Sequence, residues 1–118
     1  MNIDFYAVSQ KHLTFLAEEG VAPGVFVKMS TNATVAPCSA GDTPIGICTS
    51  SEGDCASIQL EGHCKIVYTL PAETQVKLGY QNFVCSDSTT LKPDAAGRQV
   101  LVLSLGTENE KKIAEILL

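Results

Sequence analysis

The stretch HCKIVYTL, residues 63–70, alternates two kinds of side chain along its length. One set consists of Cys64, Ile66, Tyr68 and Leu70, and the other of His63, Lys65, Val67 and Thr69. Successive side chains of a β-strand point to opposite faces, whereas a helix would require a period near 3.6. The stretch therefore predicts a strand with one face on a core and the other toward water.

The same period of two recurs on both sides of this stretch. It is present in GVFVKM (24–29), ASIQL (56–60), RQVLVLSL (98–105) and KKIAEILL (111–118). The last two segments predict a C-terminal β-hairpin. Turn signals such as Pro23-Gly24, Gly41-Asp42 and Glu61-Gly62 separate the runs, at a spacing typical of a sandwich or small barrel. We therefore predict an all-β fold, a single small β-barrel or sandwich.

Residues 9–19 form the one segment in which a helix competes with a strand. Ser9 could cap such a helix and Gly20 could end it. Glu18 and Glu19, however, would lie at the negative end of the helix dipole. We predict a strand at 12–17, within a single domain over 12–118 that contains no tandem repeat.

Residues 1–11 then become an extended N-terminal arm. Such a tail is disordered in isolation or ordered by a partner. Its apolar side chains are the candidate contact residues of the chain: Ile3, Phe5, Tyr6 and Val8.

The composition disfavours several classes of partner. The net charge is −5, and the eight basic residues are scattered singly except at Lys111–Lys112. Nucleic-acid binding requires a basic face that neutralises phosphates, so we expect no nucleic-acid partner. No run approaches the roughly 18 apolar residues of a membrane span, and the N-terminus does not look like a secretory signal. We expect no membrane partner and synthesis in a cytoplasm.

The five cysteines, at 38, 48, 55, 64 and 85, do not form a recognisable site pattern. Their odd count and long spacings argue against a disulfide framework, and the absence of a C-x-x-C pair argues against a zinc knuckle. Most of them fall in strand-like apolar runs, where a free cysteine behaves as a small hydrophobe. We expect reduced thiols, in the core or at the surface, rather than a site.

Catalytic groups are few in this sequence. His63 stands beside Cys64, but neighbours on a strand point to opposite faces and cannot act together directly. We expect His63 to face solvent, and a dyad between more distant cysteine and histidine residues is the remaining enzymatic alternative. The acidic residues in or beside glycine turns have an ordinary turn explanation. We predict no catalytic residue, no cofactor and no metal.

An ordered set of segments resembles a known family. These segments are Pro23–Val27, Thr34–Ala36, AGDTPIGI (40–47), ASIQLEG (56–62), Val67-Tyr68, VKLGY (76–80) and the closing strand pair. Together they resemble the small capsid decoration, or head cement, proteins of tailed phages and prophages, over about residues 12–118. The resemblance implies a β-tulip-like fold and assembly as a homotrimer on the outer face of an expanded capsid.

On this resemblance we expect a structural virion protein. Its partner would be the major capsid protein, and it would stabilise the phage head against the pressure of packaged DNA. The apolar arm would extend the contact with the shell. Two alternatives are another virion module, such as a head-fibre base or tail component, and a small β-barrel with a metal-binding or enzymatic role.

Overall fold

The computed structural model describes residues 10–71 and 74–118, and these residues form strands and turns without a helix. The all-β prediction is therefore confirmed. The strands are β1 (Lys11–Ala17), β2 (Phe26–Thr31), β3 (Thr34–Pro37), β4 (Gly46–Glu52), β5 (Cys55–Glu61), β6 (His63–Tyr68), β7 (Gly79–Cys85), β8 (Thr90–Pro93), β9 (Arg98–Glu108) and β10 (Lys111–Leu117). The strand predicted at 12–17 is present as β1, which also takes in Lys11 from the predicted arm.

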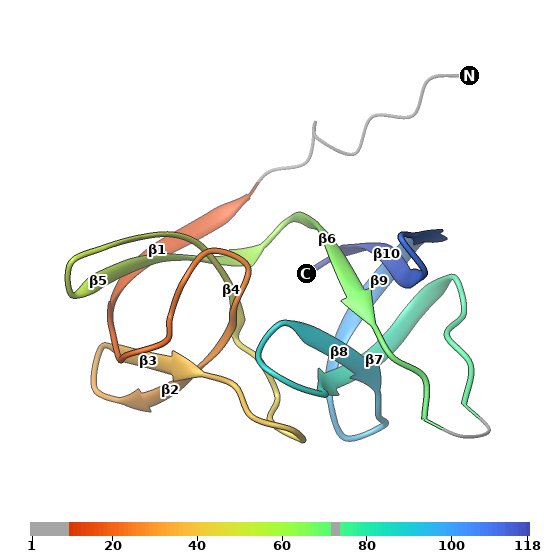
Figure 1. The fold of residues 1–118 in the computed structure, drawn as a ribbon, viewed down its shortest axis with the longest axis horizontal. Helices are drawn as coiled ribbons and strands as arrows, with labels where there is room; N and C mark the ends of the chain where they lie inside the picture. Colours follow the sequence, from red (N-terminus) through yellow and green to blue (C-terminus); the bar gives the residue numbers. More distant parts are fainter. Residues whose placement is uncertain (1–9, 72–73) are drawn as a thin grey trace.

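The strands close into two small barrels that lie side by side (Figure 1). Barrel 1 has the strand order β1-β3-β2-β4-β5, and barrel 2 has the order β10-β6-β8-β7-β9. The C-terminal hairpin is confirmed as β9–β10 in barrel 2. Asn109 and Glu110 make its turn with φ of 50° and 66°, the two positive values that a tight hairpin turn of matching twist requires.

The two barrels follow the same path. In each, the first strand pairs in parallel with the third, and every other pairing is antiparallel. The registers also correspond: Val27 lies opposite Pro37 in barrel 1, and Phe83 lies opposite Pro93 in barrel 2. We expected one barrel without a tandem repeat, so the repeated unit is a correction.

The repeat was missed because it is preserved in few side chains. Aligned by strand register, residues 34–41 read TVAPCSAG and residues 90–97 read TLKPDAAG, with Thr, Pro, Ala and Gly in common. The fifth strands align as ASIQL (56–60) and AEILL (114–118). A strand needs only alternation and a closing turn, so two copies can share a path with little identity.

Each barrel has its own buried core. Val27, Val35 and Ile58 are among the residues that fill barrel 1. The core of barrel 2 contains Phe83, Leu91 and Ile116, together with Phe26 and Cys38 from barrel 1. Because two side chains of barrel 1 are buried in the core of barrel 2, the barrels pack against each other. The assignment of 12–118 to one domain stays a prediction.

Polar contacts complete the junction between the barrels. Arg98 of β9 donates hydrogen bonds to the backbone carbonyls of Ile45 and Leu60 in barrel 1. The Phe26 amide donates to the Ser88 carbonyl across the junction, at 2.7 Å. Hydrogen bonds with a charged donor contribute more than neutral ones, so the junction combines apolar packing with directional contacts.

Candidate interaction surface

The predicted contact residues Ile3, Phe5, Tyr6 and Val8 lie outside the residues that the structure describes. Their role stays a prediction. The candidate surface must therefore be built from the two barrels.

The segment AGDTPIGI (40–47) lies at the junction between the barrels. The Gly41 amide donates to the Cys85 carbonyl, and the Cys85 amide donates to the Asp42 carbonyl, each at 2.8 Å. The Asp42 carboxylate accepts hydrogen bonds from Lys28 Nζ at 2.7 Å and from the Ser39 amide at 2.8 Å. These two bonds hold the pKa of Asp42 below its ordinary value. This segment, one of those that carry the resemblance, therefore builds the fold.

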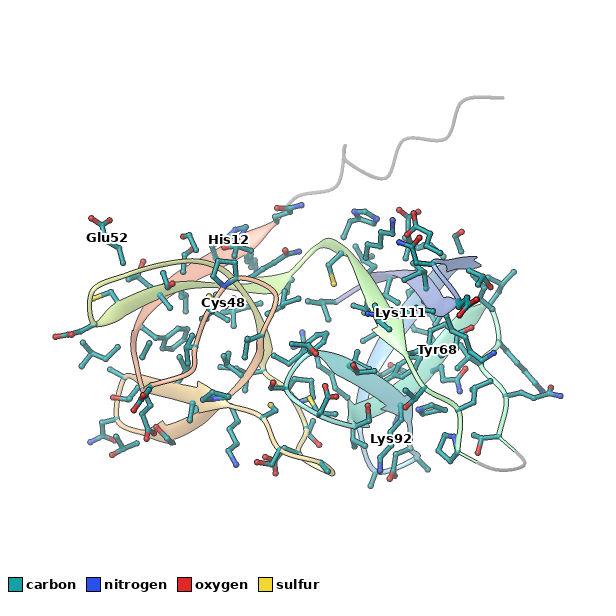
Figure 2. The ribbon with its side chains drawn as sticks, viewed as in Figure 1. His12, Cys48, Glu52, Tyr68, Lys92 and Lys111 are labelled. Atoms are coloured by element: carbon teal, nitrogen blue, oxygen red, sulfur yellow. The ribbon has the colours of Figure 1, made fainter. Side chains whose placement is uncertain are left out.

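The two histidines lie on different barrels. His12 is exposed on β1 (Figure 2). His63 is buried, with 6% of its surface exposed, which contradicts the expected solvent-facing position. Gly62 turns the chain directly from β5 into β6, so His63 enters the junction, where its carbonyl accepts a bond from Gln59 and its Nε2 lies 3.6 Å from Glu115.

The thiol beside His63 is poorly suited to nucleophilic chemistry. Burial raises the pKa of Cys64 to about 12, although the nearby Arg98 guanidinium lowers it in part. A thiol with such a pKa is almost fully protonated at neutral pH and is a weak nucleophile. His63 and Cys64 therefore do not form a catalytic pair.

The cysteines of the chain are all free thiols. Cys38, Cys48 and Cys85 are buried, Cys64 is half-buried and Cys55 is exposed. Most of the cysteines therefore pack in the core, as their apolar strand setting indicated. Within 10–71 and 74–118, no group of three or more His, Cys, Asp or Glu side chains is placed to hold a metal ion. None of these residues belongs to a helix long and apolar enough to cross a bilayer.

Barrel 2 carries an apolar surface on the outer side of three strands. Tyr80 of β7 lies opposite Leu101 of β9, and Leu101 lies opposite Leu117 of β10, so the three side chains form one row across the sheet. Val100, Val102 and Ile116 point into the core, and alternation places the row on the other face. Leu78, directly before β7, is two residues from Tyr80 and is also exposed. We call Leu78, Tyr80, Leu101 and Leu117 the Tyr80 surface.

The exposure of this surface is high at one end. Tyr80 is 73% exposed and Leu78 is 66% exposed, while Leu101 and Leu117 are half-buried. Contiguous exposed apolar side chains on a small domain mark an interaction site more often than scattered ones do. A tyrosine suits such a site because its ring supplies contact area and its hydroxyl remains hydrated.

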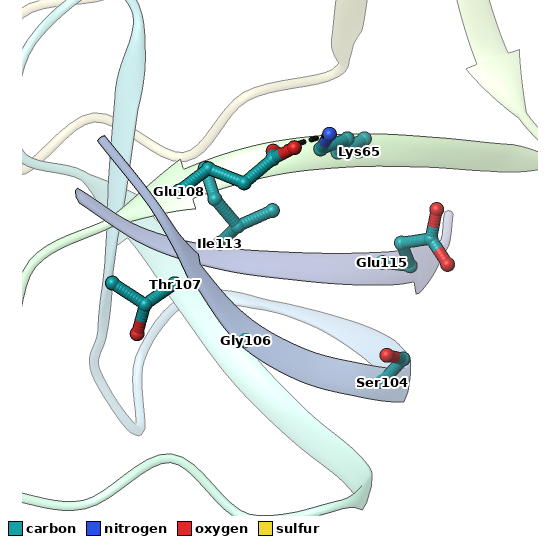
Figure 3. Close-up of a pocket in the computed structure, with 7 residues that line it drawn as sticks. All are labelled: Lys65, Ser104, Gly106, Thr107, Glu108, Ile113 and Glu115. Carbon is teal, nitrogen blue, oxygen red and sulfur yellow. Dashed lines mark ion pairs between the residues drawn. The ribbon is translucent and has the colours of Figure 1, made fainter. Parts of the chain in front are cut away.

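Charged residues lie on the same face of the sheet as Leu117, because Glu115 stands two residues before it on β10. A shallow hollow of about 210 Å³ lies over β6, β9 and β10, and its lining includes Lys65, Glu108 and Glu115 (Figure 3). Lys65 forms an ion pair with Glu108 there. An apolar centre with a charged rim is the usual anatomy of a protein–protein interface.

The sequence pattern did not lead us to predict the Tyr80 surface, although it contains a signal for it. In RQVLVLSL, Leu101 and Leu103 are apolar as well as Val100 and Val102, so both faces of the strand are apolar. In an antiparallel sheet one face is usually polar, and a strand that is apolar on both faces requires a second cover.

Comparison of the chain with protein-family models and with curated protein sequences finds no match.

Proposed function

We propose that this chain is a capsid decoration protein of a tailed phage or prophage. It binds the outer surface of the expanded head, with the major capsid protein as its partner and a homotrimer as its assembled form. Its role is structural, with no catalytic step and no cofactor. It is made in the cytoplasm of the bacterial host and ends on the outside of the virion.

The Tyr80 surface is the observation that carries this proposal. An apolar patch on an otherwise acidic molecule supports binding to a protein surface, because a net charge of −5 disfavours phosphate-rich partners. The ordered segments that resemble decoration proteins support the phage assignment. Several of them build the strands and the junction, so they bear on the fold rather than on the contact face.

Stabilisation of a capsid follows from preferential binding. A protein that binds the expanded shell and not its precursor stabilises the expanded state by mass action. A trimer multiplies weak single contacts, because the second and third contacts become intramolecular once the first has formed. The Tyr80 surface supplies one such contact for each chain, and the arm at 1–11 adds to it.

Co-sedimentation with expanded empty heads of the encoding phage tests the proposal. We expect the wild-type protein, a trimer by light scattering, to sediment with the shells. Tyr80→Ser should weaken binding by about 30-fold, the effect of removing one dominant contact residue. Because Tyr80 is 73% exposed, this change should leave the stability of the free protein almost unchanged.

Leu16→Ser is the matched control. Leu16 is 49% exposed on the outer face of β1 in barrel 1, away from the Tyr80 surface, and its replacement should leave binding intact. Wild-type protein that ignores the shells would refute the decoration role. Equal binding by wild type and Tyr80→Ser would instead move the contact to another face.

A further inference from the structure

Two cysteines from different barrels meet at the junction. Cys38 directly follows β3 of barrel 1, and Cys85 is the last residue of β7 in barrel 2. Both belong to the same buried cluster, at 4% and 0% exposed. The loop that begins at Cys38 is held against Cys85 by the backbone bonds of Gly41 and Asp42 to that residue.

The two cysteines lie in one buried cluster, in segments held together by backbone bonds. The interaction between their side chains holds the pKa of Cys38 below its ordinary value and raises the pKa of Cys85. Burial and the Asp42 carboxylate oppose this lowering of the Cys38 pKa, and the Lys28 ammonium, which is paired with Asp42 beside the loop, offsets them in part. Redox-sensitive cysteines combine a thiol of lowered pKa, a resolving thiol nearby and access for the oxidant, and the buried Cys38 gains the last of these only when its loop opens.

The pair belongs to the junction and not to the repeated unit. Strand register aligns Cys85 with Met29 and Cys38 with Asp94, so neither barrel contains a second pair of this kind. The remaining thiols do not share the arrangement. Cys48 donates to the Ser50 carbonyl inside barrel 1, and burial raises its pKa.

We infer that Cys38 and Cys85 form an oxidation site, which a small-molecule disulfide such as oxidised glutathione converts into a cross-link between the barrels. The Cys38 thiolate attacks one sulfur of oxidised glutathione, so that a mixed disulfide forms and one glutathione thiolate leaves. That thiolate takes the Cys85 proton. The Cys85 sulfur then attacks the Cys38 sulfur and releases the second glutathione as a thiolate, which takes up from solvent the proton that Cys38 gave up on ionising.

The balance of this reaction is complete. The protein loses two hydrogens and gains one S–S bond, and one glutathione disulfide becomes two glutathione thiols. Because both sulfurs are buried, the reaction requires opening of the loop at 38–42, whose residues Ser39 to Asp42 lie at or near the surface. Once formed, the bond restricts the unfolded chain and should raise Tm by about 10 °C.

Mass spectrometry of the full-length protein tests the inference. Cys55→Ser serves as the background, because the exposed Cys55 could cross-link separate chains. After incubation with oxidised glutathione, removal of excess reagent and alkylation in denaturant, two fewer cysteines should carry the label than in the reduced sample. Peptide mapping should join the peptides that contain Cys38 and Cys85. A cross-link between other cysteines, or none, would overturn the inference.

Three further variants test whether the rise in Tm comes from the Cys38–Cys85 cross-link or from oxidation of other cysteines. Cys38→Ala and Cys85→Ala should each lose the cross-link and the oxidant-dependent rise in Tm. Cys48→Ala, at a buried cysteine of barrel 1, should retain both. The peptide map needs only the Cys55→Ser protein, so it decides the question even if a core variant fails to fold. The site does not depend on capsid binding, and shells take no part in its test.

Discussion

Barrel 1 and barrel 2 follow the same path but differ in the residues that face outward. In barrel 1, Phe26 and Cys38 point away from their own core and are buried against barrel 2. The equivalent positions in barrel 2 are Asn82, which is half-buried, and Asp94, which is exposed. The same backbone position is therefore apolar where a neighbour covers it and polar where water does. The two barrels share the path of the backbone, whereas packing at the junction determines which side chains occupy the equivalent positions.

At the ends of the two barrels, positions that are buried or half-buried in barrel 2 are exposed in barrel 1. In barrel 2, Cys64 is half-buried and Cys85 is fully buried beside barrel 1. Their equivalents in barrel 1 are Leu13, 55% exposed, and Met29, 46% exposed. Barrel 1 thus covers the end of barrel 2. Within residues 10–71 and 74–118, no segment covers the equivalent end of barrel 1 in the same way. Because equivalent positions differ in burial, the side chains of one barrel do not suit the other.

The largest difference in stability between the barrels should come from exchanging the side chains at the equivalent positions 26 and 82. We expect Phe26→Asn to lower the free energy of unfolding by about 3–5 kcal/mol, because it removes a buried aromatic ring and buries an amide in its place. The reciprocal change Asn82→Phe should cost about 1 kcal/mol, the value of the bond from its side chain to the Ala95 carbonyl. Urea unfolding of both variants measures the difference.

A graded variant protects this test against complete unfolding. Phe26→Leu keeps an apolar side chain and should lose less stability than Phe26→Asn. Similar losses for Phe26→Asn and Asn82→Phe would mean that burial at the junction does not distinguish the barrels.

Replacing the glycine that the two aligned loops share, Gly41 in barrel 1 and Gly97 in barrel 2, should give a smaller difference in stability. A Cβ on Gly97 would lie 2.1 Å from the Phe83 carbonyl oxygen, so Gly97→Ala forces the backbone apart and should cost about 3 kcal/mol. Gly41 has open space around it but a φ of +88°, so Gly41→Ala should cost only about 1 kcal/mol, from backbone strain. Thermal unfolding ranks the two, and a larger loss for Gly41→Ala would contradict the packing argument.

The smallest change in stability should appear at acidic pH and arise from Asp42, in the loop that follows β3 of barrel 1. The bond from Lys28 lowers the pKa of Asp42 below its ordinary value of 3.8, so the unfolded chain binds this proton more readily than the folded chain does. The resulting stabilisation is present above the unfolded pKa and is lost as pH falls through the folded pKa. We expect Asp42→Asn to reduce the acid-dependent part of the stability loss, measured by urea unfolding between about pH 5 and pH 2.

Asp87→Asn provides a comparison from barrel 2. A bond from the Thr89 amide lowers the pKa of Asp87, so this variant should also reduce the acid dependence. The double variant should show the sum of the two effects, because the carboxylates have separate partners. An unchanged acid profile in Asp42→Asn would show that its ion pair with Lys28 does not persist in solution.

Alternation in the sequence correctly predicted the all-β fold, the strand at 12–17 and the C-terminal hairpin. These features depend on local pattern, because a period of two and a closing turn specify a strand without reference to distant residues. The buried position of His63 was not predictable in this way. It depends on Gly62 directing the chain into the junction, and that junction is formed by residues such as Arg98 and Ile45, far apart in the sequence.

The sequence by itself therefore determined the class of the fold, the net negative charge and the apolar strand setting of most cysteines, all of which follow from composition and short-range pattern. Only the tertiary structure decided that the strands close into two barrels, that Cys38 meets Cys85, and that Tyr80, Leu101 and Leu117 form one outward row. Strand pairing and register join residues distant in the sequence, and alternation alone does not say which strands are neighbours or which apolar face remains uncovered.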